Sequence, residues 1–324
     1  MVNMEIFEEL QKDFPQLQKD VLLKNHTTFK IGGPAKYFLS TYNPEELKKG
    51  IEKCLSLGIK FCLLGGGSNV LINDKGFDGM VIVYKGDDYF EIKEENGFSY
   101  ILVKASIPLS SLVVQFNNYT GLEWAIGIPG TLGGAINGNA GAFNESISDS
   151  IESVNVLIID EKEVKDKVFS KEDCEFGYRT SKFKNNSNII ILSALLKLKK
   201  GNEKEIKEKI KINLEKRFLK QPKGFSAGSV FKNYFGKIKE EIIFDDEELK
   251  KFNEKEIIPA GILIDRCGLK GKIIGNAQIS EKHANFIINL GEATSEDVVA
   301  LINLIKNEVK KKYFIELEEE IKIF

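Results

Sequence analysis

Histidine, cysteine and arginine are scarce in this chain of 324 residues, and these absences limit the chemistry that it can carry. The two histidines, His26 and His283, stand far apart, which leaves little from which to build a zinc site or a histidine-based nucleophile triad. The four cysteines form no C-x-x-C pair, so we expect buried thiols and neither disulfides nor metal ligands. The composition therefore predicts no metal site.

A long hydrophobic run is also missing. The longest strongly apolar stretch, residues 189–196, is far too short to cross a bilayer, and residues 1–10 are acidic and amphipathic, unlike a signal peptide. The 46 basic and 48 acidic side chains leave a net charge of −2, which gives no reason to expect nucleic acid or an anionic membrane as a partner. We therefore predict a cytoplasmic protein that binds neither.

The three arginines, Arg179, Arg217 and Arg266, stand out because every other one of the 46 basic residues is a lysine. Lysine supplies a point charge, whereas arginine supplies a planar, permanently charged fork that can hold a carboxylate or phosphate through two hydrogen bonds. The three arginines are therefore candidates for such binding, with structural ion pairing as the alternative.

The residue pattern mixes strands and helices without strict alternation, which predicts the α+β class. Asn43 and Pro44 followed by two glutamates form a helix start, and this helix should end at Gly58. Asn96-Gly97 between two strand-like runs predicts a β-hairpin over residues 90–105. Further expected elements are strands at 59–64, 80–84, on both sides of 160–161 and at 189–198, and helices at 108–119, 203–218 and from a capping box at Thr294 and Asp297 through 309.

Two glycine-rich segments carry the strongest functional signal. Residues 65–69 read Gly-Gly-Gly-Ser-Asn directly after a predicted strand, and glycine recurs throughout residues 121–142. Because glycine lacks a Cβ and accepts positive φ, successive backbone N–H groups can converge on an anion, commonly a pyrophosphate. Residues 65–69 and 130–142 are therefore predicted to hold a dinucleotide cofactor.

These segments fit neither common nucleotide template. A Rossmann fingerprint would need glycine at Val70, and no G-x-x-x-x-G-K-[ST] motif exists. Tight turns and close packing are the alternative explanation.

Several separated blocks, in the right order, resemble the UDP-N-acetylenolpyruvoylglucosamine reductase (MurB) family. They are residues 27–33, 65–69, 127–134, 137–142, 177–181, 227–233, 260–265, 277–278, 283–286 and 317–321. The resemblance implies an oxidoreductase of peptidoglycan precursor synthesis with bound FAD and with NADPH as hydride donor. Its reaction would reduce UDP-N-acetylglucosamine enolpyruvate to UDP-N-acetylmuramate.

The resemblance also implies the domain plan. An FAD-binding region of the PCMH (vanillyl-alcohol-oxidase) type would cover residues 1–204, in subdomains of about 1–84 and 85–204. An α+β substrate domain, residues 205–324, would follow, with its C-terminal tail contributing to the active site. The expected FAD contacts are Gly65, Gly66, Gly67, Ser68, Asn69, Pro129, Gly130, Thr131, Gly133, Gly134, Asn139, Ala140 and Gly141.

Three residues match the family's catalytic groups: Arg179 would grip the substrate carboxylate, Glu320 would help to polarise it, and Ser229 would donate a proton. A serine hydroxyl is a weak acid, so its role needs a neighbour, such as Lys232, that raises its acidity. From the residues alone, Arg179 could form a structural ion pair, Ser229 could be a turn serine and Glu320 a solvated acid.

Two other activities remain open. Residues 229–232 satisfy the S-x-x-K signature of serine–lysine acyl-transfer enzymes, although the companion S-D-N and K-T-G tripeptides do not occur. A different FAD-dependent oxidoreductase of the same superfamily, acting on an alcohol or aldehyde, would share the glycine-rich segments but not the catalytic trio.

Substrate contacts are expected at Tyr178, Lys220, Asn233 and His283, which lie at or near family positions. The chain resembles the shorter subclass, which lacks a tyrosine-bearing loop, so which element covers the nucleotide is open. Residues 234–258 form a charged segment that we interpret as a surface insertion rather than a lid. We expect a monomer or weak oligomer.

Overall fold

The computed structural model describes residues 2–86, 88–160 and 163–324, which form two compact units. Unit 1 comprises Met1–Val21, Ala35–Gly66 and Phe77–Arg217, and unit 2 comprises Leu22–Pro34, Gly67–Gly76 and Phe218–Phe324. Helices and strands occur in both units, which confirms the predicted α+β class. The predicted boundary after residue 204 lies at the start of helix α5 (Glu203–Lys220), whereas the structure divides near the end of that helix.

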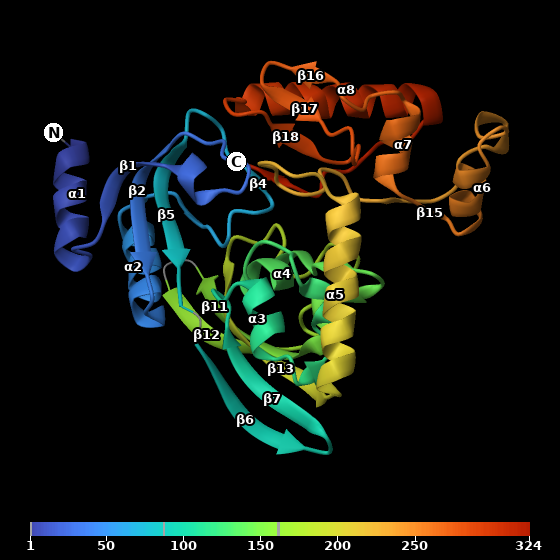
Figure 1. Ribbon diagram of the computed structural model, residues 1–324. Coiled ribbons are helices and arrows are strands. Elements are labelled where there is room, and N and C mark those ends of the chain that lie inside the picture. Colours follow the sequence, from blue (N-terminus) through green and yellow to red (C-terminus); the bar gives the residue numbers. More distant parts are fainter. Residues whose placement is uncertain (1, 87, 161–162) are drawn as a thin grey trace. The chain divides into compact units, whose positions relative to one another are not determined.

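The first part of unit 1 is a four-stranded sheet with two helices, seen at the blue end of the ribbon in Figure 1. Its strand order is β1-β2-β5-β3, and β5 pairs in parallel with both β2 and β3. The elements are α1 (Val2–Asp13), β1 (Gln18–Leu22), β2 (Pro34–Thr41), α2 (Pro44–Ser56), β3 (Phe61–Leu63) and β5 (Phe77–Tyr84).

Local sequence explains helix α2. The Asn43 side chain accepts a hydrogen bond from the Glu45 amide at 2.8 Å, and Pro44 occupies the first helical position. The apolar side of the helix is fully buried through Leu47 and Ile51. The predicted helix start at Asn43 and Pro44 is therefore confirmed.

The second part of unit 1 is a six-stranded antiparallel sheet of order β12-β11-β13-β7-β6, with β8 also pairing with β13. The hairpin turn at Asn96 and Gly97 has φ values of 53° and 79°, as a tight turn with two positive φ angles requires. The strands are β6 (Tyr89–Glu95), β7 (Phe98–Lys104), β8 (Tyr119–Thr120), β11 (Ile151–Asp160), β12 (Glu163–Ser170) and β13 (Ile189–Lys200).

The two faces of this sheet contribute to different cores. One face packs with α3 (Leu109–Gln115) and α4 (Leu132–Gly138) around the fully buried Trp124. The other face contributes Leu157 and Ile190 to the core that α2 and the four-stranded sheet share. Alternating side chains thus bury the sheet on both sides. Short elements on the α3 side are η2 (Glu123–Ala125), β9 (Gly141–Ala142), β10 (Glu145–Ser146) and η3 (Ile147–Ser150).

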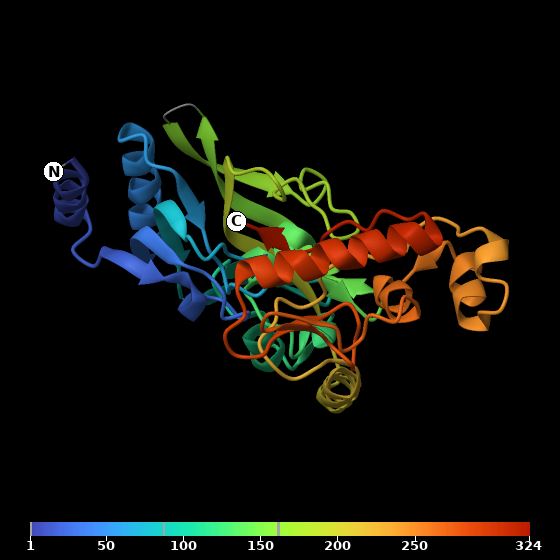
Figure 2. The same cartoon turned by 90° about the horizontal axis from the view of Figure 1, so that it is seen from above.

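Unit 2 is built around a long C-terminal helix and a small antiparallel sheet of order β16-β17-β18. Helix α8 (Ser295–Tyr313) runs along this sheet in Figures 1 and 2. It starts at the predicted capping box, in which the Thr294 hydroxyl accepts from the Asp297 amide at 3.1 Å and the Asp297 carboxylate accepts from the Thr294 amide at 3.0 Å.

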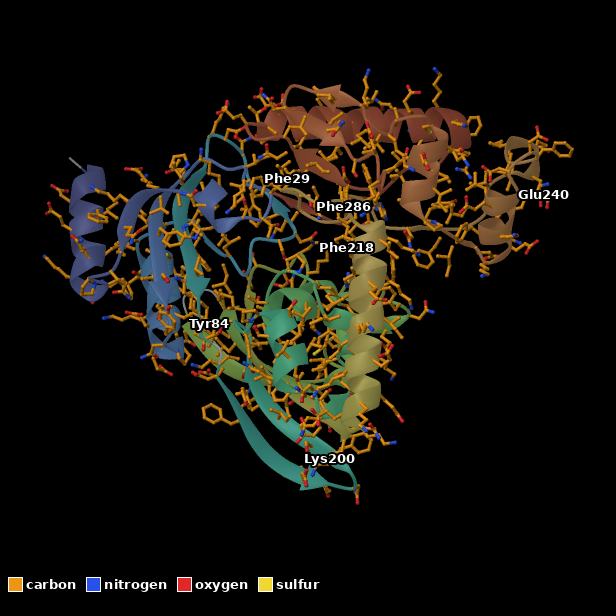
Figure 3. The ribbon with its side chains drawn as sticks, viewed as in Figure 1. Phe29, Tyr84, Lys200, Phe218, Glu240 and Phe286 are labelled. Carbon is orange, nitrogen blue, oxygen red and sulfur yellow. The ribbon has the colours of Figure 1, made fainter. Side chains whose placement is uncertain are left out.

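The core of unit 2 joins segments from three parts of the chain. Phe29 and Leu71, both fully buried, pack with Phe231 and with the apolar side of α8. Figure 3 marks Phe29 and Phe286 among the side chains of this unit. Its remaining elements are η1 (Leu23–His26), β4 (Val70–Leu71), β14 (Tyr234–Phe235), η4 (Glu240–Ile242), α6 (Glu247–Glu254), β15 (Ile257–Ile258), α7 (Ala260–Arg266), β16 (Ile273–Ile274), β17 (Ala277–Ile279), β18 (Ile287–Asn289) and β19 (Lys322–Ile323).

The segment 234–258 is folded against this core. Ile243 and Leu249 are buried, and the Arg266 guanidinium pairs with Asp246 and Glu248. Arg266 thus has the structural ion-pairing role that was the alternative to a binding role. None of the helices in the described part of the chain combines the length and apolarity needed to cross a bilayer.

Candidate functional site

The two glycine-rich segments meet in unit 1. A Cβ built on Gly66 would lie 2.6 Å from the Cα of Gly130, and one built on Gly65 would lie 3.0 Å from the Thr131 hydroxyl oxygen. Real Cβ atoms do not approach backbone atoms so closely, so glycine at position 66 is what lets the two segments touch. The sequence predicted both segments, but not that they contact each other.

This contact brings together backbone amides that bond to no other backbone group in the described part of the chain. Within the described residues, the N–H groups of Gly65, Gly66, Gly130 and Thr131 donate to no backbone carbonyl. Gly65 and Gly66 are exposed and Gly130 and Thr131 are half-buried, and phosphate oxygens could accept hydrogen bonds from these N–H groups. The cradle therefore fits a pyrophosphate group, which is the test that an FAD site must pass here.

The second glycine-rich segment, residues 130–142, is partly helical. Residues 132–138 form α4, with Thr131 as its N-cap: the Thr131 hydroxyl accepts from the Gly134 amide at 3.3 Å. Asn139 ends the helix in the left-handed region with a φ of 42°. Glycine at 133 is explained by packing, because a Cβ there would lie 2.9 Å from the Ala105 Cβ.

Hydrogen bonds connect the end of this segment to residues 177–181. The Asn139 side-chain amide donates to the Gly177 carbonyl at 2.9 Å, and the Ser181 hydroxyl donates to the Asn137 carbonyl at 2.7 Å. The Ala140 amide donates a hydrogen bond to the Ala135 carbonyl at 2.8 Å. Two of the blocks that carry the family resemblance are thus one local structure.

Arg179 lies in this structure. Its guanidinium donates to the Gly141 carbonyl at 2.7 Å and lies 5.2 Å from the centre of the Tyr178 ring. Its φ is 52°, a left-handed backbone conformation that is unfavourable for a long side chain, and the Lys184 ammonium bonds its carbonyl at 2.9 Å. Strained backbone conformations that are held by surrounding hydrogen bonds are common at functional sites, where the direction of a side chain matters.

Ser229 and Glu320 lie on adjacent segments of unit 2. Phe231 pairs with Glu319 in an antiparallel bridge, the Glu320 amide donates to the Val230 carbonyl at 2.7 Å, and the Lys232 amide donates to the Glu318 carbonyl at 2.9 Å. Residues far apart in sequence are therefore held in register by backbone bonds. Arg179 belongs to unit 1 and the other two proposed catalytic residues to unit 2.

The Ser229–Lys232 geometry argues against a serine–lysine acyl-transfer enzyme. The segment is not helical, so the fourth residue is not brought onto the face of the first as one helical turn would do. The Lys232 ammonium instead pairs with the Glu318 carboxylate. The ammonium group that was expected to raise the acidity of the Ser229 hydroxyl is thus paired with the Glu318 carboxylate.

The remaining part of the first glycine-rich segment belongs to unit 2. Gly67 has a φ of 60°, and a Cβ there would lie 2.0 Å from the His26 carbonyl oxygen. The Asn69 side-chain amide donates to the Glu320 carbonyl at 3.1 Å, and the Lys322 amide donates to the Asn69 carbonyl at 3.0 Å. Asn69 therefore anchors the C-terminal tail that carries Glu320.

The four predicted substrate contacts have different surroundings. Tyr178 is in unit 1 and is 41 % exposed. The other three are in unit 2: Lys220 is exposed, and the Oδ1 of Asn233 accepts from the Ala260 amide at 3.4 Å. His283 is largely enclosed: its Nδ1 accepts from the Asn285 amide at 3.2 Å, and burial lowers its pKa below 6.5.

Sequence reasoning missed Asn285. It is 4 % exposed, and its side chain bonds both backbone groups of Phe231, two residues after Ser229. It stands inside one of the family-like blocks, but nothing in the residue pattern indicates which backbone a buried asparagine will reach.

The cysteines are free, and burial raises the pKa of the Cys54 and Cys174 thiols to about 12. Such thiols are poor nucleophiles and poor metal ligands at neutral pH. Among the described residues, no group of three or more histidine, cysteine, aspartate or glutamate side chains is arranged to hold a metal ion.

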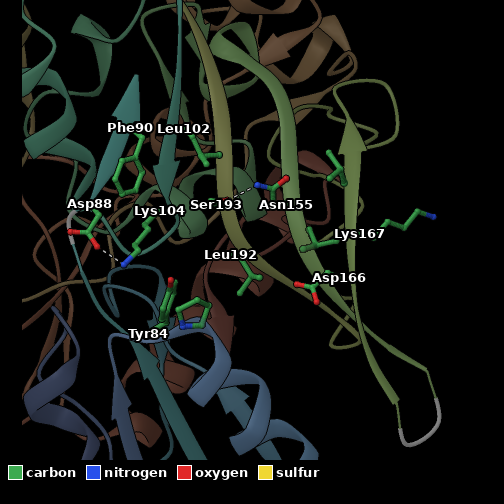
Figure 4. Close-up of a pocket in the computed structure, with 13 residues that line it drawn as sticks. Tyr84, Asp88, Phe90, Leu102, Lys104, Asn155, Asp166, Lys167, Leu192 and Ser193 are labelled. Carbon is green, nitrogen blue, oxygen red and sulfur yellow. Dashed lines mark hydrogen bonds and ion pairs between the residues drawn. The ribbon is translucent and has the colours of Figure 1, made fainter. Parts of the chain in front are cut away.

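One pocket of about 430 Å³ lies in unit 1, on the sheet face that is turned away from α3 and α4. Figure 4 shows the hydrogen bond between Asn155 and Ser193, which measures 2.8 Å, and the ion pair between Lys104 and Asp88. None of the predicted site residues lines it, so it gives no support to the predicted cofactor site.

Comparison with known proteins identifies the family. Residues 221–324 match the model described as the C-terminal domain of UDP-N-acetylenolpyruvoylglucosamine reductase, and residues 35–165 match an FAD binding domain. The reductase of Clostridium tetani is 37 % identical over 305 residues, which cover 93 % of this chain and 90 % of that protein. The reductase of Prochlorococcus marinus is 38 % identical over 310 residues, covering 95 % and 97 %.

A solved structure agrees with these relatives. The UDP-N-acetylenolpyruvylglucosamine reductase (MurB) of Thermus caldophilus superposes with a TM-score of 0.73 at 32 % identity, covering 95 % of this chain and 99 % of that one. Identity above 30 % over nearly the whole length of several relatives is decisive for membership. The chain belongs to the UDP-N-acetylenolpyruvoylglucosamine reductase family.

Proposed function

We propose that this protein is an FAD-dependent, NADPH-driven reductase that converts UDP-N-acetylglucosamine enolpyruvate to UDP-N-acetylmuramate. The observation that carries the proposal is the register between the Ser229 segment and the tail that bears Glu320, fixed by the 2.7 Å bond from the Glu320 amide to the Val230 carbonyl. This register brings together the segments of Ser229 and Glu320, which would have complementary roles in one reaction. Relatives of the chain bear the name of that reductase.

The cofactor would be held by residues 65–69 and 129–141. The amides of Gly65, Gly66, Gly130 and Thr131, which donate to no backbone carbonyl among the described residues, suit a pyrophosphate. The Gly66–Gly130 contact leaves no room for a side chain between the two segments. When bound, FAD supplies a hydride acceptor toward NADPH and a hydride donor toward the terminal carbon of the enolpyruvyl double bond.

The protein's own residues would stabilise charge and deliver one proton. Hydride addition shifts negative charge toward the substrate carboxylate, which the permanently charged Arg179 would hold and Glu320 would help to polarise. The Ser229 hydroxyl would pass its proton to the carbon next to the carboxylate, so that one hydride and one proton saturate the double bond. Tyr178, Lys220, Asn233 and His283 would bind the nucleotide, with the Lys220 ammonium beside its phosphates.

The proposal also covers the domain organisation, the oligomeric state and the cellular location. Residues 1–204 would form the FAD-binding region and residues 205–324 the substrate domain. We expect a cytoplasmic protein that is a monomer or weak oligomer, and analytical ultracentrifugation of the purified protein would test the oligomeric state.

The test of the proposed function is an absorbance scan followed by a rate measurement. The purified protein should be yellow and should oxidise NADPH faster when the enolpyruvyl nucleotide is added. A colourless protein that cannot be reconstituted with FAD would overturn the cofactor assignment. A yellow protein whose NADPH oxidation ignores the nucleotide would overturn the substrate assignment and favour another flavin oxidoreductase.

A further inference from the structure

A second hydrogen-bonded partner flanks the Ser229 segment, on the side away from the Glu320 tail. Ser229 forms an antiparallel bridge with Phe286, and the Val230 amide donates to the Asn285 carbonyl at 2.8 Å. At the next residue, Phe231, the backbone bonds are made by the Asn285 side chain. Its Oδ1 accepts from the Phe231 amide at 2.9 Å, and its Nδ2 donates to the Phe231 carbonyl at 2.8 Å.

Asn285 thus makes, with one side chain, the two bonds that a continuing strand would make. With its own carbonyl it fixes two consecutive residues, Val230 and Phe231, directly after Ser229. The side chain is 4 % exposed, so water cannot replace these bonds when the amide is removed.

The same segment carries Glu320 on its other edge. The Val230 carbonyl accepts from the Glu320 amide, and the Glu320 carbonyl accepts from the Asn69 side chain at 3.1 Å. A shift of residues 230–231 would therefore move Ser229 and Glu320 together, since both depend on the same backbone.

We propose that Asn285 is a positioning residue for proton delivery, which holds the Ser229 hydroxyl in its productive place by clamping the backbone of Phe231. This inference rests on the proposed function, because it assigns Asn285 a role only through Ser229. Asn285 would touch neither the substrate nor the cofactor, and would act by fixing the segment between itself and the Glu318–Glu320 tail.

The chain offers a matched control in Asn253. Its side chain, in a residue 8 % exposed, makes the same double clamp on a backbone: Oδ1 accepts from the Ile238 amide at 2.6 Å and Nδ2 donates to the Ile238 carbonyl at 3.0 Å. Asn253 lies on α6, and its clamp bonds none of the residues 229–232 or 318–320. Asn253→Ala therefore removes an equivalent buried amide clamp from the same unit.

The experiment measures the two half-reactions separately in the FAD-loaded enzyme. Asn285→Ala should reduce the enolpyruvyl nucleotide more slowly by a factor of about 10 to 100, as expected for a misplaced reacting group, while its rate with NADPH stays near that of the wild type. Asn253→Ala should keep both rates and lose thermal stability to a similar extent. Equal effects of the two variants on nucleotide reduction would overturn the proposal.

A double-mutant cycle with Ser229→Ala separates this inference from the proposed function. If Asn285 acts through Ser229, then Asn285→Ala should slow nucleotide reduction by a smaller factor once the hydroxyl is gone, because only its effect through Glu320 is left. Full multiplication of the two effects would assign Asn285 a purely structural role. An active Ser229→Ala variant would instead refute the proton-donor role itself.

Asn285→Asp tests the same role if Asn285→Ala folds poorly. Asn285→Asp retains the acceptor for the Phe231 amide but loses the donor to its carbonyl until the carboxyl group is protonated. Its rate of nucleotide reduction relative to the wild type should rise as the pH falls. A ratio that is independent of pH, with a normal melting temperature, would contradict the positioning role.

Discussion

Gly66→Ala should weaken FAD binding, because position 66 is where the two glycine-rich segments touch. The added Cβ would lie 2.6 Å from the Gly130 Cα and 3.1 Å from the Gly130 carbonyl carbon. Carbon atoms in contact prefer a separation of about 3.5 to 4.0 Å, so the two backbones must part by roughly 1 Å. Neither obstacle is a flexible side chain that could turn away.

The size of the effect follows from the amides on each side of this contact. Parting the segments separates the N–H groups of Gly65 and Gly66 from those of Gly130 and Thr131, which are proposed to share one pyrophosphate. A hydrogen bond to a charged group contributes about 1.5 to 3 kcal/mol, so the loss of one bond weakens binding by roughly tenfold to a hundredfold.

The assay is titration of the apoprotein with FAD, followed by the quenching of flavin fluorescence. Gly138→Ala is the control: Gly138 is the last residue of α4 and is not one of the expected FAD contacts, and apart from its chain neighbours and the helix's own backbone no atom lies within 4 Å of a Cβ built there. That variant should bind FAD normally and be at least as stable as the wild type, since alanine has a higher helix propensity than glycine. Unchanged FAD affinity in Gly66→Ala would refute the assignment of the cradle.

Three further predictions concern pH, thiol reactivity and helix capping. Burial lowers the pKa of His283 below 6.5, so the unfolded chain takes up a proton that the folded chain does not, and the free energy of unfolding should fall as the pH drops from about 6.5 toward the folded pKa. Urea unfolding at several pH values should show this loss, and His283→Gln should reduce it. Since burial raises the pKa of Cys54 and Cys174 to about 12, mass spectrometry should find both unalkylated after iodoacetamide treatment of the native protein near neutral pH; rapid labelling would contradict their burial. Gly275→Ala would place a Cβ 2.1 Å from the Asp297 carboxylate, at a φ of 54°, and should displace the capping box of α8 at a cost of about 1 to 2 kcal/mol in thermal unfolding; an unchanged melting temperature would show that the box tolerates the shift.

Local features of the fold were predictable where local chemistry decides them. The Asn43 cap, the turn at Asn96-Gly97 and the capping box at Thr294 and Asp297 each depend on bonds within a few residues, and each is present. The helix predicted over 108–119 is shorter, ending at Gln115, because the chain turns into β8.

Long-range pairing could not be predicted in the same way. The blocks around Ser229 and Glu320 were visible in the sequence, but their register depends on the bridge between Phe231 and Glu319. The clamps of Asn253 and Asn285 have no sequence signature, since a buried asparagine can reach any backbone that packing brings to it. The expected roles of Arg179, Ser229 and Glu320 come from the family resemblance and stay predictions.

The pairing of β4 with β19 has a consequence for how the chain folds during synthesis. Val70 and Leu71 are made early, yet their partner strand in the described chain is Lys322–Ile323, and the Phe324 carbonyl accepts from the Asn73 amide at 3.1 Å. Unit 2 must therefore wait for almost the entire chain, whereas the sheets of unit 1 have all their strands once residue 200 has left the ribosome. Until then residues 22–34 and 67–76 are loops of a growing chain that lack their permanent neighbours, and a nascent chain halted before residue 322 would leave them accessible to protease.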